Sequence, residues 1–101
     1  MPPDGRIFGQ VLHHDDPILG ATVYLKYNAT EFPGMLPEDY DEQVSASEVD
    51  ATFEFSELPK GSYYLYSIGD DLDCPCQVFG GIPVVLQSDS EILETNIPVT
   101  E

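Results

Sequence analysis

The chain has 101 residues, and 42% of them are hydrophobic, so it is long enough for one domain with one core and too apolar for global disorder. It carries 19 Asp and Glu residues against three Lys and Arg residues, which gives a formal net charge of -16 at pH 7. This charge repels phosphate backbones and anionic membranes, so it excludes nucleic acid as a partner and attracts cations and basic proteins. No run of residues is long and apolar enough for a membrane-spanning helix, and we expect no membrane span.

The first part of the chain predicts a lead-in and two strands. Residues 1–5 form a polar lead-in and lack the basic and apolar segments of a signal peptide. Residues 6–13 alternate loosely and predict a strand, which ends at the polar sequence His-His-Asp-Asp-Pro. Residues 21–27 alternate most regularly, with valine and leucine on one face and threonine, tyrosine and lysine on the other, and predict a half-buried strand.

The rest of the chain also predicts strands joined by turns. Residues 28–42 are acidic and contain proline, which predicts a long connection with room for a helix only near residues 37–43. Further strands are expected at residues 43–49, 52–56, 63–68, 82–86 and 91–99, with the first two forming a hairpin about Asp50-Ala51 and a loop filling residues 69–81. About seven short strands with turn signals between them predict an all-β fold, a single antiparallel sandwich spanning residues 1–101.

Two of these strands meet at a Pro-Gly turn, and their alternation predicts the core. Phe53 and Phe55 share one face before the turn, and Tyr63 and Leu65 share one face after it. Together with the valine and leucine of residues 21–27, these side chains should point inward. The Tyr63 ring can be buried while its hydroxyl reaches the backbone at a corner of the sandwich.

Three motifs of glycines and alternating apolar residues follow one another along the chain. They read Gly9-x-Val11, then Pro17-Ile18-x-Gly20-Ala21-x-Val23-x-Leu25, then Phe53-x-Phe55-x-x-Leu58-Pro59-x-Gly61-x-Tyr63-x-Leu65. This order resembles the carboxypeptidase regulatory-like domain, whose prealbumin-like, Greek-key sandwich is shared with collagen-adhesin B-type repeats and transthyretin. The resemblance implies a non-enzymatic structural or binding module of an exported bacterial protein. Its location would be extracellular, at the cell surface or periplasmic, with a protein or a glycan there as its partner.

Relatives of this fold that carry chemistry need residues that this chain lacks at the matching positions. Adhesin B-type domains join a lysine of the first strand to an Asn or Asp of the last with the help of an acid. Here the first strand offers Arg6 in place of lysine, Ser67 stands at the position of the acid, and only Asn96 remains. Hydrolases and dioxygenases on related sandwiches use separated histidines, whereas His13 and His14 are adjacent. We therefore expect no isopeptide crosslink and no enzymatic activity.

Reversal of each consecutive strand would gather the loops that hold His13 and Asp70 at one pole of the sandwich. There, Asp70, Asp71 and Asp73 supply the carboxylate oxygens that Ca²⁺ prefers, although they lack the spacing of a known calcium loop. This alternative makes the chain a small cation-binding protein that uses residues 70–76. The other interpretation is a solvated acidic loop without a cofactor, which keeps the protein soluble.

Cys74 and Cys76 flank Pro75 and allow more than one state. A disulfide would close a very small, strained ring, and free thiols are the equal alternative. A metal site formed by both cysteines and a histidine is a third interpretation.

Tyr24, Tyr64 and Tyr66 are expected on the outward face of neighbouring strands. Such rings can stack on sugars, which makes a carbohydrate-binding accessory domain the alternative function. Exposed tyrosines on strands also follow from β-propensity alone.

Overall fold

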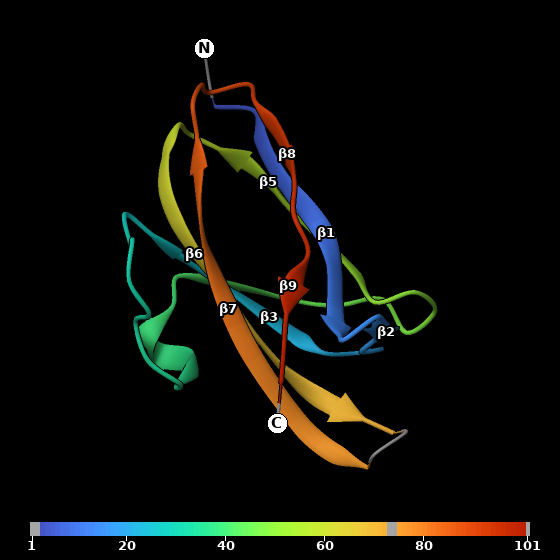
Figure 1. Ribbon diagram of the computed structural model, residues 1–101. Helices are drawn as coiled ribbons and strands as arrows, with labels where there is room; N and C mark the ends of the chain where they lie inside the picture. Colours follow the sequence, from blue (N-terminus) through green and yellow to red (C-terminus); the bar gives the residue numbers. More distant parts are fainter. Residues whose placement is uncertain (1–2, 73–74, 101) are drawn as a thin grey trace.

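The computed structural model of the protein describes residues 3–72 and 75–100 and consists of two β-sheets packed face to face (Figure 1). In the first sheet, β1 (Gly5–His13) is central, with β5 (Thr52–Leu58) antiparallel on one side and β8 (Ile92–Glu94) and β9 (Ile97–Pro98) parallel on the other. A short β2 (Asp16–Pro17) pairs with the end of β1. The second sheet has the order β4 (Glu42–Ser45), β3 (Thr22–Tyr27), β6 (Gly61–Asp71) and β7 (Cys76–Leu86), and every neighbouring pair in it is antiparallel. The described ranges thus hold nine strands, and the predicted all-β sandwich is confirmed.

The core lies between the sheets and is built from the side chains that strand alternation assigned to it. Val23, Leu25 and Leu65 are completely buried, and Phe53, Phe55 and Tyr63 are at most 4% exposed. They belong to one continuous cluster with apolar residues from both sheets. Alternate residues of a strand point to opposite faces of the sheet. This core therefore forms when every second residue of each strand is apolar and points inward.

The Pro-Gly turn between β5 and β6 is fixed by Tyr63. The ring of this residue is buried, and its hydroxyl donates a hydrogen bond of 2.5 Å to the carbonyl oxygen of Pro59. Burial raises the pKa of the Tyr63 hydroxyl, and the carboxylates of Glu42 and Asp89 raise it further. The hydroxyl therefore stays protonated and can donate, as the sequence predicted for this corner of the sandwich.

The predicted hairpin about Asp50-Ala51 is wrong. Strand β4 pairs with β3 in the second sheet, whereas β5 pairs with β1 in the first, so residues 46–51 cross from one sheet to the other. The crossing is held by a carboxylate oxygen of Asp50, which accepts hydrogen bonds from the backbone N–H and the hydroxyl of Thr52 at 3.2 and 2.8 Å. Local alternation predicts strands, but it carries no information on which sheet each strand joins.

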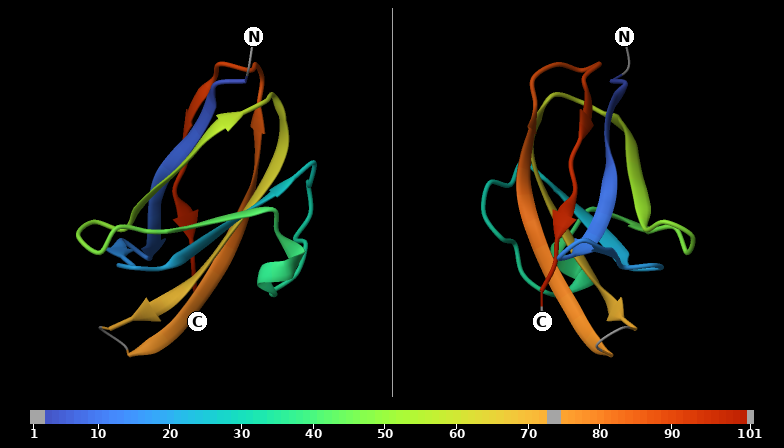
Figure 2. Two further views of the ribbon diagram at one scale, coloured as in Figure 1. Left: turned by 180° about the vertical axis from the view of Figure 1, so that it is seen from behind. Right: turned by 45° about the vertical axis from the view of Figure 1, so that its right-hand side comes forward.

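The loop predicted at residues 69–81 is also wrong, because β6 and β7 pair without interruption from Gly61 and Leu86 to Asp71 and Cys76. This hairpin extends past the other strands at one end of the molecule (Figure 2). Gly69, Gly80 and Gly81 lie within its strands and are not turn residues. A Cβ atom at Gly80 would collide with the carbonyl oxygen of Pro98, so this glycine allows the C-terminal segment to lie against β7.

Two smaller differences concern the connection after β3 and the last strand. A short 3-10 turn, η1 (Pro37–Asp39), replaces the helix considered there, and no helix in the described ranges is long and apolar enough to span a membrane. The last predicted strand is divided into β8 and β9, which run parallel to β1 rather than antiparallel. The chain leaves β7 at the pole where β1 begins, so its next segment runs in the direction of β1.

Candidate functional site

The outer face of the second sheet carries a cluster of aromatic rings. Tyr24 on β3 and Tyr66 on β6 are neighbours across the strands, with ring centroids 6.1 Å apart. Tyr40, from the connection between β3 and β4, lies 5.3 Å from Tyr24 and stacks on Tyr66 at 5.7 Å. Phe32, from the same connection, lies 5.5 Å from Tyr66 and 6.0 Å from Tyr64. The connection therefore folds over the tyrosines, on the side of the sheet that faces away from β1 (Figure 2).

This arrangement corrects the prediction of an open tyrosine strip. Tyr66 is 1% exposed and Tyr24 is 9% exposed, so two of the three expected glycan contacts are covered. Tyr64 is only partly buried, and its ring centroid lies 6.0 Å from that of Phe32. The alternation of residues along the strands predicts all three rings on the outer face. The burial of two of them depends on Phe32 and Tyr40, which are distant in sequence from β6.

Two tyrosines of the cluster, Tyr40 and Tyr66, have hydroxyl groups with raised pKa values. Burial raises the pKa of Tyr40 above its ordinary value of 10.0, and the neighbouring Tyr66 and Tyr64 raise it further. Burial also raises the pKa of Tyr66, with a smaller contribution from Tyr24. Among the described residues, the Tyr66 hydroxyl is buried without a hydrogen-bond partner, which is an unusual and destabilising state for a polar group.

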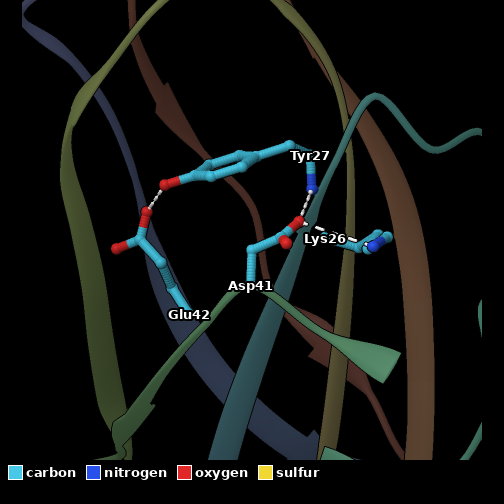
Figure 3. A network of polar contacts seen from close by, with 4 residues as sticks. All are labelled: Lys26, Tyr27, Asp41 and Glu42. Atoms are coloured by element: carbon cyan, nitrogen blue, oxygen red, sulfur yellow. Dashed lines mark hydrogen bonds and ion pairs between the residues drawn. The ribbon is translucent and has the colours of Figure 1, made fainter. Parts of the chain in front are cut away.

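The end of the connection is anchored to β3 by a polar network (Figure 3). A carboxylate oxygen of Asp41 accepts a hydrogen bond of 2.9 Å from the backbone N–H of Tyr27 and lies 3.7 Å from the ammonium group of Lys26. The Tyr27 hydroxyl donates a short hydrogen bond to Glu42, and the Asp41 N–H donates to the carbonyl oxygen of Leu25 at 2.9 Å. These contacts fix the place where the chain returns to the sheet as β4.

The interior of the connection has its own hydrogen bonds. The Tyr40 hydroxyl donates to the carbonyl oxygen of Gly34 at 2.7 Å, and a carboxylate oxygen of Asp39 accepts from the Leu36 N–H at 3.2 Å. The first of these bonds ties the aromatic cluster to the middle of the connection. A long surface connection with internal hydrogen bonds and aromatic packing presents its remaining side chains in a defined arrangement.

The connection exposes three large apolar side chains and also carries acidic residues. Phe32, Met35 and Leu36 are 50%, 52% and 55% exposed, and we call these three residues the apolar crest. The acidic residues of the same segment are Glu31, Glu38, Asp39 and Asp41. Large apolar side chains gathered on a surface are a feature of interaction sites, whereas single ones are ordinary.

The pole that holds His13 contains a buried contact between a histidine and a carboxylate. His13, at the end of β1, and Asp71, at the end of β6, are 5% and 6% exposed, and Nδ1 of His13 lies 2.7 Å from a carboxylate oxygen of Asp71. The predicted meeting of these two segments at one pole is therefore confirmed. The Asp71 carboxylate, however, joins the two sheets and is not directed to solvent.

The predicted calcium residues do not converge in the described part of the chain. Asp70 is exposed and Asp71 is buried, because adjacent residues of β6 point to opposite faces, and Asp73 lies outside the described residues. Within the described ranges there is no group of three His, Cys, Asp or Glu residues that could hold a metal ion. Asp70 therefore supplies an exposed carboxylate, and the described residues do not bring the companions that a calcium site requires beside it.

Of the two cysteines, Cys74 lies outside the described residues. Cys76, at the start of β7, is disulfide-bonded and not a free thiol. A thiolate of Cys76 is therefore not present for the metal site with a histidine that the sequence allowed.

No family model and no curated protein matches the chain. The resemblance to carboxypeptidase regulatory-like domains thus remains a prediction that rests on the three glycine and strand motifs. Sequence reasoning did not select Phe32, Tyr40 or the crest residues. The sequence feature that could have indicated them is the presence of large apolar side chains in a connection that is otherwise acidic. Rules based on strand alternation do not take such side chains into account.

Proposed function

We propose that this protein is a non-enzymatic binding module of an exported or cell-surface protein, and that its contact surface is the apolar crest. The observation that carries the proposal is the half-exposed state of Phe32, Met35 and Leu36. The connection that carries them is fixed to the sheet by the stacking of Tyr40 on Tyr66 and by the hydrogen bond from Tyr27 to Asp41. A preorganised apolar surface loses little conformational entropy on binding, and this increases its affinity.

The charge of the protein limits what the crest can bind. Glu31, Glu38, Asp39 and Asp41 belong to the same segment as the crest, and the net charge of the chain is -16. A second copy of the chain would be repelled, whereas a basic partner would be attracted and oriented. The best occupant is therefore a protein segment with an apolar anchor between lysine or arginine residues.

The disulfide at Cys76 supports the proposed location, because disulfides persist mainly in oxidising compartments such as the cell exterior and the bacterial periplasm. The family resemblance points to the same compartments.

The experiment uses a synthetic peptide of alternating lysine and phenylalanine as the probe, measured by isothermal titration at physiological ionic strength. The wild-type chain should bind it, and Phe32→Ser combined with Leu36→Ser should weaken the affinity by about tenfold or more, since each lost side chain contributes roughly 1 to 2 kcal/mol of burial. Val49→Ser is the matched control, because Val49 is a highly exposed apolar residue outside the connection. Absence of binding, or equal weakening by the control, would exclude the crest as the contact surface.

The alternative of carbohydrate binding depends on Tyr64, since Tyr24 and Tyr66 are buried. A glycan array probed with the wild-type chain and with Tyr64→Ala tests it. A glycan that binds the wild type and not the variant would replace the protein partner in this proposal.

A further inference from the structure

The first and last described strands of the chain are parallel neighbours. Residues Arg6 to Phe8 of β1 pair with β8, and Val11 and Leu12 pair with β9, so the pairing covers most of the length of β1. We call this contact of β1 with β8 and β9 the terminal pairing. Because the strands run in the same direction, β1 begins at one pole and β9 ends toward the other (Figures 1 and 2). The molecule is elongated, with a longest dimension of 45 Å.

Hydrogen bonds join the two parts of the terminal pairing along its length. The Arg6 N–H donates to Glu91 at 2.9 Å, the Thr95 N–H donates to Phe8 at 2.8 Å, and the Val99 N–H donates to Leu12 at 2.9 Å, each to a carbonyl oxygen. Between β8 and β9, where the backbone ladder is interrupted, a side chain completes the series. The amide oxygen of Asn96 accepts from the Gln10 N–H at 3.1 Å.

Close backbone packing also holds the C-terminal segment in place. A Cβ atom at Gly9 would collide with the carbonyl oxygen of Thr95, so this glycine lets residues 95 and 96 lie directly on β1. Past β9, Thr100 exchanges two hydrogen bonds of 2.9 Å with Phe79 of β7. The last described residues therefore contact strands of both sheets.

From this geometry we infer a mechanical function: the terminal pairing bears tension that is applied between the two ends of the chain. Pulling the start of β1 and the end of β9 apart moves two parallel strands along one another. All hydrogen bonds between them then carry the load together and must break together. If the two strands were pulled apart from the same pole, the bonds would break one after another at a lower force.

Single-molecule force spectroscopy on the full chain tests this inference through two pulling geometries. In the first, handles are attached at the two termini. In the second, one handle stays at the N-terminus and the other is attached at position 90 through an azide-bearing residue. Position 90 precedes β8 and is next to the start of β1, since the Asp4 N–H donates to the Asp89 carbonyl oxygen at 2.7 Å. The second geometry therefore separates the same strands from one end.

Because at least four hydrogen bonds are loaded together in the first geometry, we expect its unfolding force to be about two to four times that of the second. Asn96→Ala should lower the force of the first geometry by at most about a quarter, since it removes one of at least four bonds. Gln77→Ala, which truncates an exposed amide side chain on β7, should leave it unchanged. Equal forces in the two geometries, or a lower force between the termini, would overturn the inference.

Discussion

The buried hydroxyl of Tyr66 gives a sharp test of the structure, because the same substitution at Tyr63 should have the opposite effect. Tyr66 is 1% exposed, and its hydroxyl has no hydrogen-bond partner among the described residues. Tyr63 is equally well buried, but its hydroxyl donates to Pro59. Replacing either residue by phenylalanine keeps the ring and removes only the oxygen.

A buried polar group without a partner costs about 1 to 3 kcal/mol of stability, whereas a satisfied hydrogen bond contributes about 0.5 to 1.5 kcal/mol. Tyr66→Phe should therefore raise the free energy of unfolding by about 1 to 2 kcal/mol, and Tyr63→Phe should lower it by about 1 kcal/mol. For a domain of this size each kcal/mol shifts the melting temperature by roughly 4 to 8 °C, so the two variants should be separated clearly.

The assay is urea unfolding followed by circular dichroism, with the free energy extrapolated to water and the slope compared among the three proteins. If the dependence of the unfolding free energy on urea concentration differed among the three proteins, the substitutions would have changed the unfolded state. The free energies could then not be compared directly. A loss of stability in Tyr66→Phe greater than about 0.5 kcal/mol would show that the hydroxyl has a partner, and it would refute the reasoning about this face of the sheet.

Phe55→Ala should cost about 3 to 5 kcal/mol in urea unfolding because Phe55 is 2% exposed, while the control Glu54→Ala on the opposite face of β5 should cost little. The raised pKa values of Tyr40 and Tyr66 mean that the folded state keeps protons which the unfolded state releases. Their stabilising contribution is thus complete below the ordinary value of 10.0 and is lost as the pH rises above it, so the melting temperature should fall at alkaline pH, and less steeply in Tyr66→Phe. Sodium chloride should raise the melting temperature by screening the net charge of -16, and calcium should add nothing at matched ionic strength; an extra calcium shift that disappears in Asp70→Asn would establish a calcium site instead.

The sequence alone was sufficient to predict the fold class and the core. Alternation along a strand has a period of two residues, so Phe53 and Phe55, or Val23 and Leu25, must share a face wherever the strand is placed. The Tyr63 corner was likewise predictable, because the turn that it closes is only four residues away along the chain. The large acidic excess and the absence of separated histidines are also visible without any structure.

Only the tertiary structure decided which strands are neighbours and which polar groups are covered. The ends of β4 and β5 are close in sequence but belong to different sheets. The glycine-rich segment of β7 is a strand because it pairs with β6, and Gly80 leaves room for Pro98, which is distant in sequence. The candidate site was missed for the same reason. Tyr24 and Tyr66 are buried by Tyr40 and Phe32. The sequence pattern of a strand does not predict these contacts, because the burial of a side chain depends on which other segments pack against the strand.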